Sequence, residues 1–153
     1  MKNIKEGIFI LLGFLVLAQL SGCKPKTTAK PLSEVLKAVF FAQQVKHDGT
    51  IVYTKGSISN TVDNYKKLRI DLSSGTSVSF TDFDGNTFLG TYLITNNTLT
   101  FSGLTPVPTG SGGTITFNVV SFVEGPTQVV LSRSGSSVKT GNTSNEYTLT
   151  TIP

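Results

Sequence analysis

Short stretches in which apolar and polar residues alternate cover most of the chain, and residues typical of turns separate them. Alternation with a period of two predicts β-strands that bury one face. Leu68, Ile70 and Leu72 alternate with polar neighbours in this way. The stretch 114–123 alternates until Val119 and then changes phase, which predicts a β-bulge at that point.

About eight to nine strands are predicted, and most are joined by short turns. The predicted strands or strand centres are 39–46, 50–54, 68–72, Val78 with Phe80, 87–95, 98–101, 114–123, 129–131 and Tyr147 with Leu149. The predicted turns are 47–49, 73–75, 84–86, 96–97 and 124–126, with a helical turn in 32–38, a polar crossover over 56–64 and a loop over 103–113. The pattern therefore predicts an all-β antiparallel meander, curled into a barrel or half-barrel because this removes exposed sheet edges.

The N-terminal residues differ from this pattern. Lys2 and Lys5 precede an unbroken apolar stretch over 8–18. As a helix these eleven residues span about 16 Å, against about 30 Å for the hydrocarbon core of a bilayer. The stretch is therefore too short for a transmembrane helix and is typical of the apolar core of an export signal peptide.

Leu20-Ser21-Gly22-Cys23 follows this stretch and resembles the lipobox of bacterial lipoproteins. The resemblance implies that the Cys23 thiol receives a diacylglyceryl group, that a peptidase cleaves before Cys23, and that the new amine is acylated. The chain is then expected to comprise a signal peptide (1–22), a lipidated tether (23–31) and a β domain (32–153), anchored to a membrane without spanning it. The alternative, a buried free thiol, is less consistent with the only cysteine of the chain directly following an apolar core.

The positive charge is concentrated near the predicted anchor. The whole chain has 13 basic and 9 acidic residues, yet Lys24, Lys26 and Lys30 lie in the tether, and from Pro31 onward bases and acids are equal in number. A nucleic-acid partner, which needs a basic face on the domain, is not expected. The tether lysines either attract anionic headgroups or belong to a plain spacer. In some bacteria an acidic residue directly after the lipidated cysteine directs retention or surface export. No such residue follows Cys23, so the resemblance to bacterial lipoproteins implies the outer membrane, facing the periplasm, as the expected location.

The segments Phe88-Leu89-Gly90-Thr91-Tyr92 and Asn97-Thr98-Leu99-Thr100-Phe101 resemble a broad group of lipocalin-like bacterial lipoproteins over roughly residues 32–152. This resemblance implies a small antiparallel barrel in the cell envelope that binds a small apolar ligand or an envelope component. At the start of the first strand the chain has Ala38-Val39-Phe40, where lipocalins carry Gly-x-Trp. The alternative is a structural or protein-interaction module with a solid core and no pocket.

The aromatic residues distinguish a ligand-binding barrel from a module with a solid core, because they either line a pocket or fill the core. A pocket also needs a few convergent polar groups to orient its ligand. The candidate pocket residues are Tyr53, Arg69, Phe80, Phe88, Tyr92, Phe101 and Phe117.

Catalysis, metal binding and cofactors are not expected. His47, the only histidine, lies in a predicted turn, where it has no obvious nucleophile to activate. The segment 82–86 places oxygens at positions 1, 3 and 5, as in a calcium loop, but its glycine is at position 4 and Leu93 stands at position 12. A hairpin turn is the simpler interpretation of this segment.

Overall fold

The computed structural model describes residues 30–123 and 127–153. The predicted signal peptide, Cys23 and the predicted turn over 124–126 lie outside the described residues. The elements are α2 (Leu32–Val35), β1 (Val39–His47), β2 (Thr50–Thr54), the 3-10 helix η2 (Asp63–Lys67), β3 (Arg69–Asp71), β4 (Ser77–Thr81), β5 (Thr87–Thr95), β6 (Thr98–Thr105), β7 (Ile115–Val123), β8 (Gln128–Arg133), the 3-10 helix η3 (Val138–Thr140) and β9 (Asn145–Thr150).

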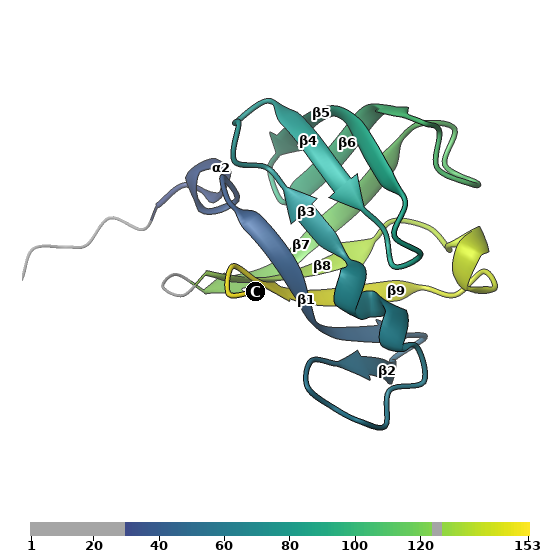
Figure 1. The fold of residues 1–153 in the computed structure, drawn as a ribbon. Coiled ribbons are helices and arrows are strands. Elements are labelled where there is room, and N and C mark those ends of the chain that lie inside the picture. Colours follow the sequence, from purple (N-terminus) through teal and green to yellow (C-terminus); the bar gives the residue numbers. More distant parts are fainter. Residues whose placement is uncertain (1–29, 124–126) are drawn as a thin grey trace, which may run out of the picture.

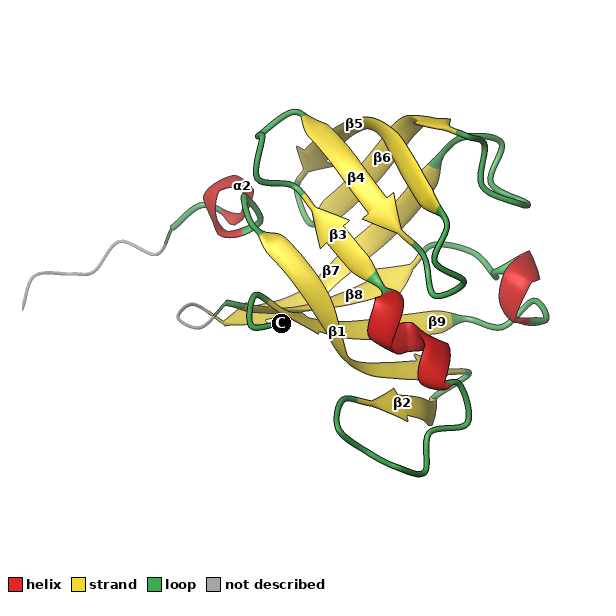
Figure 2. Cartoon of the chain, viewed as in Figure 1, coloured by secondary structure: helices red, strands yellow, loops and turns green. Residues whose placement is uncertain are grey.

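The strands form a closed antiparallel barrel (Figures 1 and 2). Strands β3 to β9 follow one another in sequence order, and β1 pairs with both β3 and β9, which closes the sheet. Strand β2 is an extra strand that pairs with the last residues of β1. The predicted all-β antiparallel meander is confirmed, and of the two forms considered the barrel is closed, so that β1 and β9 cover each other's edges.

Several predicted boundaries are confirmed, and one is wrong. The β2 and β5 ranges coincide with prediction, and the register of β7 against β8 shifts between Val119 and Ser121, as the change of phase indicates. The predicted loop over 103–113 begins too early, because β6 continues to Thr105. Gly103 has a φ of 64° at an irregularity between β5 and β6, so this glycine allows a bulge within the strand and does not end it.

The barrel interior is filled by side chains that alternate inward along the strands. A continuous row of aromatic rings crosses it, with centroids 6.0 Å apart for Phe88 and Phe80, 5.9 Å for Phe80 and Phe101, 5.3 Å for Phe101 and Phe117, and 5.9 Å for Phe117 and Tyr147. All five residues are buried. Aliphatic residues pack around the row, so the interior is a core with the close packing typical of proteins.

Local segments cover the two ends of the barrel. At the end where the chain enters, α2 directs Val35 and Leu36 into the core. At the other end, η2 inserts Tyr65, which is fully buried and contacts His47, Phe83 and Tyr147 through its ring. The barrel, its closure and its core therefore lie within residues 32–150, so this part of the chain contains what it needs to fold independently of the tether.

Candidate functional site

The structure brings four of the predicted pocket residues together, but as core. Phe80, Phe88, Phe101 and Phe117 are at most 4% exposed and pack ring against ring. Rings in contact at these distances fill the space that a ligand would need. The alternative of a solid core therefore fits these residues better than a ligand cavity.

The other three candidates are not members of this aromatic row: Tyr53 is buried at the edge of the same core, Tyr92 packs against the core, and Arg69 lies outside it. Arg69 is on the outside of β3, where its Nη2 donates to Asp71 Oδ2 at 2.8 Å. The Tyr92 hydroxyl donates to the Leu72 carbonyl at 3.0 Å, at the end of the barrel where the chain enters. Tyr53 belongs to β2 and packs against Tyr65, with ring centroids 6.2 Å apart. The seven residues consequently do not form one pocket.

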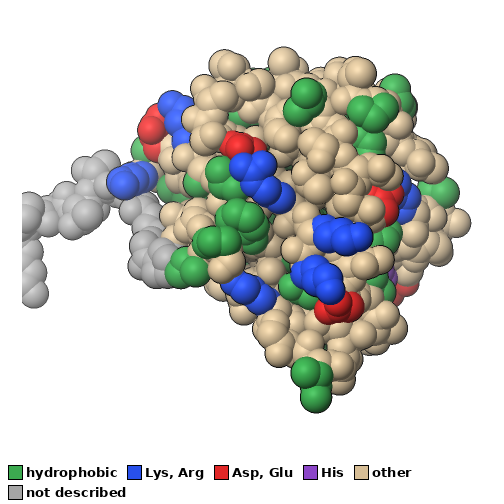
Figure 3. Space-filling view, in the orientation of Figure 1, with side chains coloured by type: hydrophobic (Ala, Val, Ile, Leu, Met, Phe, Trp, Pro, Cys, Tyr) green, Lys and Arg blue, Asp and Glu red, His purple; other side chains and the backbone are tan. Residues whose placement is uncertain are grey.

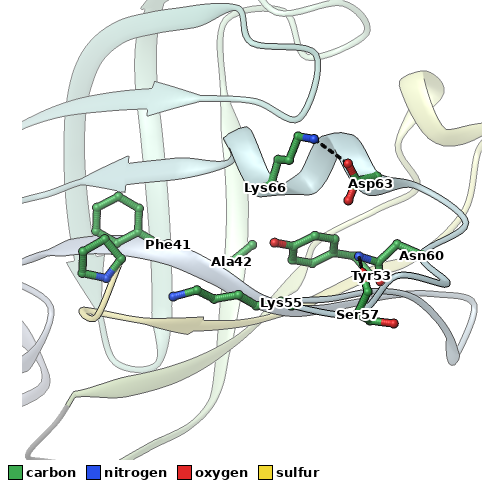
Figure 4. Close-up of a pocket in the computed structure, with 10 residues that line it drawn as sticks. Phe41, Ala42, Tyr53, Lys55, Ser57, Asn60, Asp63 and Lys66 are labelled. Atoms are coloured by element: carbon green, nitrogen blue, oxygen red, sulfur yellow. Dashed lines mark hydrogen bonds and ion pairs between the residues drawn. The ribbon is translucent and has the colours of Figure 1, made fainter.

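An open cleft of about 520 Å³ lies on the outside of the barrel, between β1, the segment after β2, η2 and the C-terminal residue (Figure 4). We call it the β1–β2 cleft. Phe41, Ala42 and Pro153 supply apolar walls, and the Tyr53 ring projects between them and η2. The remaining lining residues are Gly56 and the polar residues Lys55, Ser57, Asn60, Asp63 and Lys66.

Asn60 fixes the shape of this cleft by holding the chain that follows β2. Its Oδ1 accepts from the Thr54 backbone N–H at 2.8 Å, and its Nδ2 donates to the carbonyls of Thr54 and Ser57, both at 3.1 Å. Gly56 has a φ of 79° within this turn, a conformation that glycine adopts without steric cost. The polar crossover predicted for 56–64 is therefore an ordered wall of the cleft.

The charges of the cleft are partly compensated. A hydrogen bond from Lys66 is the main cause that lowers the pKa of the exposed Asp63 carboxyl, and the same bond raises the pKa of Lys66. Burial, followed by the nearby Asp63 carboxylate, raises the pKa of the Tyr53 hydroxyl, so this group stays protonated at neutral pH. Lys55 Nζ makes one long hydrogen bond, 3.4 Å, to the Ile152 carbonyl. The cleft thus offers a hydroxyl and one cation outside an ion pair.

The cleft belongs to a wider surface, which we call the basic–apolar face. Figure 3 shows Lys and Arg side chains around an apolar patch on this side of the molecule. Its basic members are Lys55, Lys66 and Arg69, with Lys67 of η2 at its border, where the Lys67 side chain lies beside Gly85. Its apolar members are Phe41, Ile152 and Pro153. Arg69 and Phe41 are directly opposite in the β1–β3 pairing, which places them on the same outer face.

The sequence indicated few of these residues. Tyr53 and Arg69 were the only members of the cleft and its face among the predicted site residues. The run Lys66-Lys67-Leu68-Arg69 is the one signal that points to a basic surface. The apolar half was not predictable, because it forms only when the C-terminal residues after β9 lie beside β1.

His47 is partly buried at the barrel end opposite the chain entrance. Its Nε2 lies 2.7 Å from the Tyr65 hydroxyl, and its ring meets the Tyr65 ring edge-on at 5.6 Å. Burial lowers the pKa of His47 below its usual value of 6.5, although the Asp48 carboxylate acts in the opposite direction. A neutral ring with its proton on Nδ1 accepts a hydrogen bond at Nε2 from the Tyr65 hydroxyl, which is consistent with a structural role for this contact.

This lowered pKa predicts a pH dependence of stability. Between the folded-state pKa of His47 and 6.5, the unfolded chain binds more protons, so the free energy of unfolding rises with pH and reaches its full value above pH 6.5. Urea unfolding between pH 5 and 8 measures this slope. His47→Gln keeps a hydrogen-bonding group and is expected to flatten it. An unchanged slope in that variant would assign the pH dependence to other groups.

The segment 82–86, whose oxygens are spaced as at the start of a calcium loop, forms a turn that binds a lysine side chain. Lys139 Nζ donates to Asp82 Oδ2 at 2.9 Å and to Asp84 Oδ2 at 2.7 Å, and it lies 5.2 Å from the centre of the Phe88 ring. The ammonium group therefore occupies the space between these two carboxylates. Across residues 30–123 and 127–153, no three His, Cys, Asp or Glu side chains are close enough together to bind a metal ion.

The closed eight-stranded antiparallel barrel with one extra strand is the class of fold to which this chain belongs. A solved structure, described as an uncharacterized protein from Bacteroides eggerthii DSM 20697, is similar to it with a TM-score of 0.43 and 11% sequence identity. The similarity covers 74% of this chain and 96% of that chain. No family model matches the sequence, and no curated protein matches it.

Proposed function

We propose that this chain is a lipid-anchored, non-enzymatic protein of the bacterial cell envelope that acts as a binding module through the outer surface of its barrel. The lipobox-like segment ending at Cys23 supports the anchor. The outer membrane, facing the periplasm, is the location we propose. Within the described residues, no helix has both the length and the apolar character to span a bilayer.

The single observation that carries this proposal is the contrast between the inside and the outside of the barrel. Inside, the row of buried aromatic rings fills the space where a lipocalin-like protein would hold its ligand. Outside, the β1–β2 cleft offers apolar walls, a hydroxyl and cations. We therefore propose that the relationship to lipocalin-like lipoproteins concerns the barrel and the anchor, and that the binding surface lies on the exterior.

The anchor is tested by replacing the thiol. Cys23→Ser removes the only sulfur that can carry the diacylglyceryl group. The wild-type protein is expected in the membrane fraction of lysed cells, and the variant is expected to lose most of this association, because two or three acyl chains provide the larger part of the binding energy. An unchanged distribution between membrane and soluble fractions would show that Cys23 is not the anchor.

A small apolar ligand inside the barrel is the second candidate, favoured by the lipocalin-like resemblance. Native mass spectrometry of protein released with a mild detergent separates the two. The bare polypeptide mass, with its lipid anchor alone, is expected under all growth conditions. A reproducible additional mass that is lost on Phe101→Trp but retained on Lys55→Gln would place the ligand inside the barrel and contradict the proposal.

A further inference from the structure

We infer that the basic–apolar face docks on an anionic membrane surface, so that the barrel lies against the bilayer in a fixed orientation. This inference names the occupant of the binding surface and rests on the proposed function. The face combines the two features that interfacial binding needs: apolar side chains that enter the headgroup region, and cations around them that meet lipid phosphates.

The charge of the face is opposite to that of an anionic bilayer. Four cations (Lys55, Lys66, Lys67 and Arg69) stand beside two carboxylates, Asp63 and Asp71, each of which is paired with one of the cations. None of the ion pairs among the described residues includes Lys55 or Lys67. Asp82 and Asp84 lie in the same turn as Gly85, next to Lys67, but both are paired with Lys139. On the cleft side of the face, the cations Lys55, Lys66 and Arg69 stand against only Asp63 and Asp71, so this side is positive.

The apolar part of the face lies next to the cations. Ile152 is 52% exposed, and its carbonyl accepts the hydrogen bond from Lys55. Pro153 and Phe41 line the cleft that Lys55 borders. Transfer of these apolar side chains from water into the headgroup region is favourable, and its free energy contributes to binding.

The tether gives the second argument for a membrane as the occupant. Seven residues, 24–30, separate the proposed lipid at Cys23 from Pro31, which directly precedes α2, and when extended they reach about 25 Å. This length keeps the barrel within one molecular diameter of the bilayer. Three of the seven are lysines, which favour the same anionic surface.

The test uses residues 24–153 without lipid, because the closed barrel and its core lie within 32–150. Sedimentation with vesicles of phosphatidylcholine, or of phosphatidylcholine and phosphatidylglycerol in a 7:3 ratio, measures the partition coefficient. Binding to the anionic vesicles is expected to exceed binding to the neutral ones. The double variant Lys55→Gln/Lys67→Gln is expected to bind the anionic vesicles about 25-fold more weakly, or about fivefold for each cation lost near anionic headgroups.

A matched pair of controls isolates the face. Lys37→Gln/Lys46→Gln changes the net charge by the same amount on other surfaces, where each lysine pairs with a glutamate, and is expected to reduce binding less than twofold. Ile152→Ser is expected to weaken binding to both kinds of vesicle by about fivefold. Leu93→Ser, at a similarly exposed position on β5, is expected to leave binding unchanged.

Two results would overturn the inference. Equal losses in the two double variants would mean that net charge or the tether, and not this face, governs binding. Absence of vesicle binding, together with shifts of the Tyr53 NMR signals on adding inorganic phosphate, would make the cleft a site for a soluble anion. The vesicle experiment uses protein without lipid, so neither result bears on the proposed anchor at Cys23. Conversely, if Cys23→Ser did not change membrane association, the vesicle experiment would still test the basic–apolar face.

Discussion

Phe101→Ala is expected to lower the free energy of unfolding by about 3–5 kcal/mol, as truncations of large buried aromatic side chains do. Phe101 is fully buried and contacts the rings of both Phe80 and Phe117. Its removal interrupts the aromatic row at its centre. A cavity remains, because the closed barrel cannot contract to fill the space. Urea or thermal unfolding of residues 24–153 measures the loss, which is a large fraction of the 5–15 kcal/mol typical of whole domains.

A ligand readout makes this experiment specific to the filled interior. An apolar cavity of this kind stays dry and accepts small aromatic molecules, so benzene is expected to raise the unfolding temperature of Phe101→Ala and to leave the wild type unchanged. The control is Leu93→Ala, at a site on β5 that is 66% exposed, with an expected change within about 0.5 kcal/mol. If the wild type were also stabilised by benzene, the barrel would contain a cavity and the interior would again be a candidate binding site.

Lys139→Ala is expected to have the second-largest effect on stability, about 3 kcal/mol at neutral pH, because it leaves a buried carboxylate without its partner. Asp82 is only 6% exposed and accepts from Lys139 and from the Phe83 backbone N–H. Lys139 also attaches the segment between β8 and β9 to the turn between β4 and β5. The substitution therefore leaves the Asp82 carboxylate without its ion-pair partner. It also removes the contact that holds the segment between β8 and β9 against the turn between β4 and β5.

The pH dependence of this effect separates charge from packing. Partial burial alone would raise the pKa of Asp84, but hydrogen bonds from Lys139 and Asn86 outweigh it, so the pKa of Asp84 lies below its usual value. Asp84 therefore contributes stability above pH 3.8 that is lost as the pH falls through its folded-state pKa. In Lys139→Ala this contribution is weakened, so the difference in unfolding free energy from the wild type is expected to narrow below pH 4.

Lys46→Ala is the matched control for Lys139→Ala. Lys46 pairs with Glu146 at a similar distance, 2.8 Å, but both side chains are about one-third exposed. Exposed pairs of this kind contribute about 0–1 kcal/mol. A loss for Lys139→Ala no greater than that for Lys46→Ala, at all pH values, would contradict the role assigned to burial.

The sequence by itself determined the strands and much of their detail. Turn residues on their flanks predicted the bounds of 50–54 and 87–95 to the residue. The change of phase in the alternation after Val119 marked a real bulge. Gly103 was misinterpreted, because a glycine at a strand bulge and a glycine that begins a loop have the same local signal. The proposed export signal and tether likewise rest on local sequence alone.

Only the tertiary structure decided whether the barrel is filled and where its outer surface carries charge. Both depend on contacts between residues far apart in the chain, such as Phe117 with Tyr147, Lys139 with Asp82, and Lys55 with the Ile152 carbonyl. Alternation assigns a residue to the inner face of a strand but does not say which rings meet across the barrel. The equal numbers of acids and bases likewise did not predict a basic side. Net charge is a sum over all residues, whereas the electrostatic field of a surface depends on where the charged residues lie.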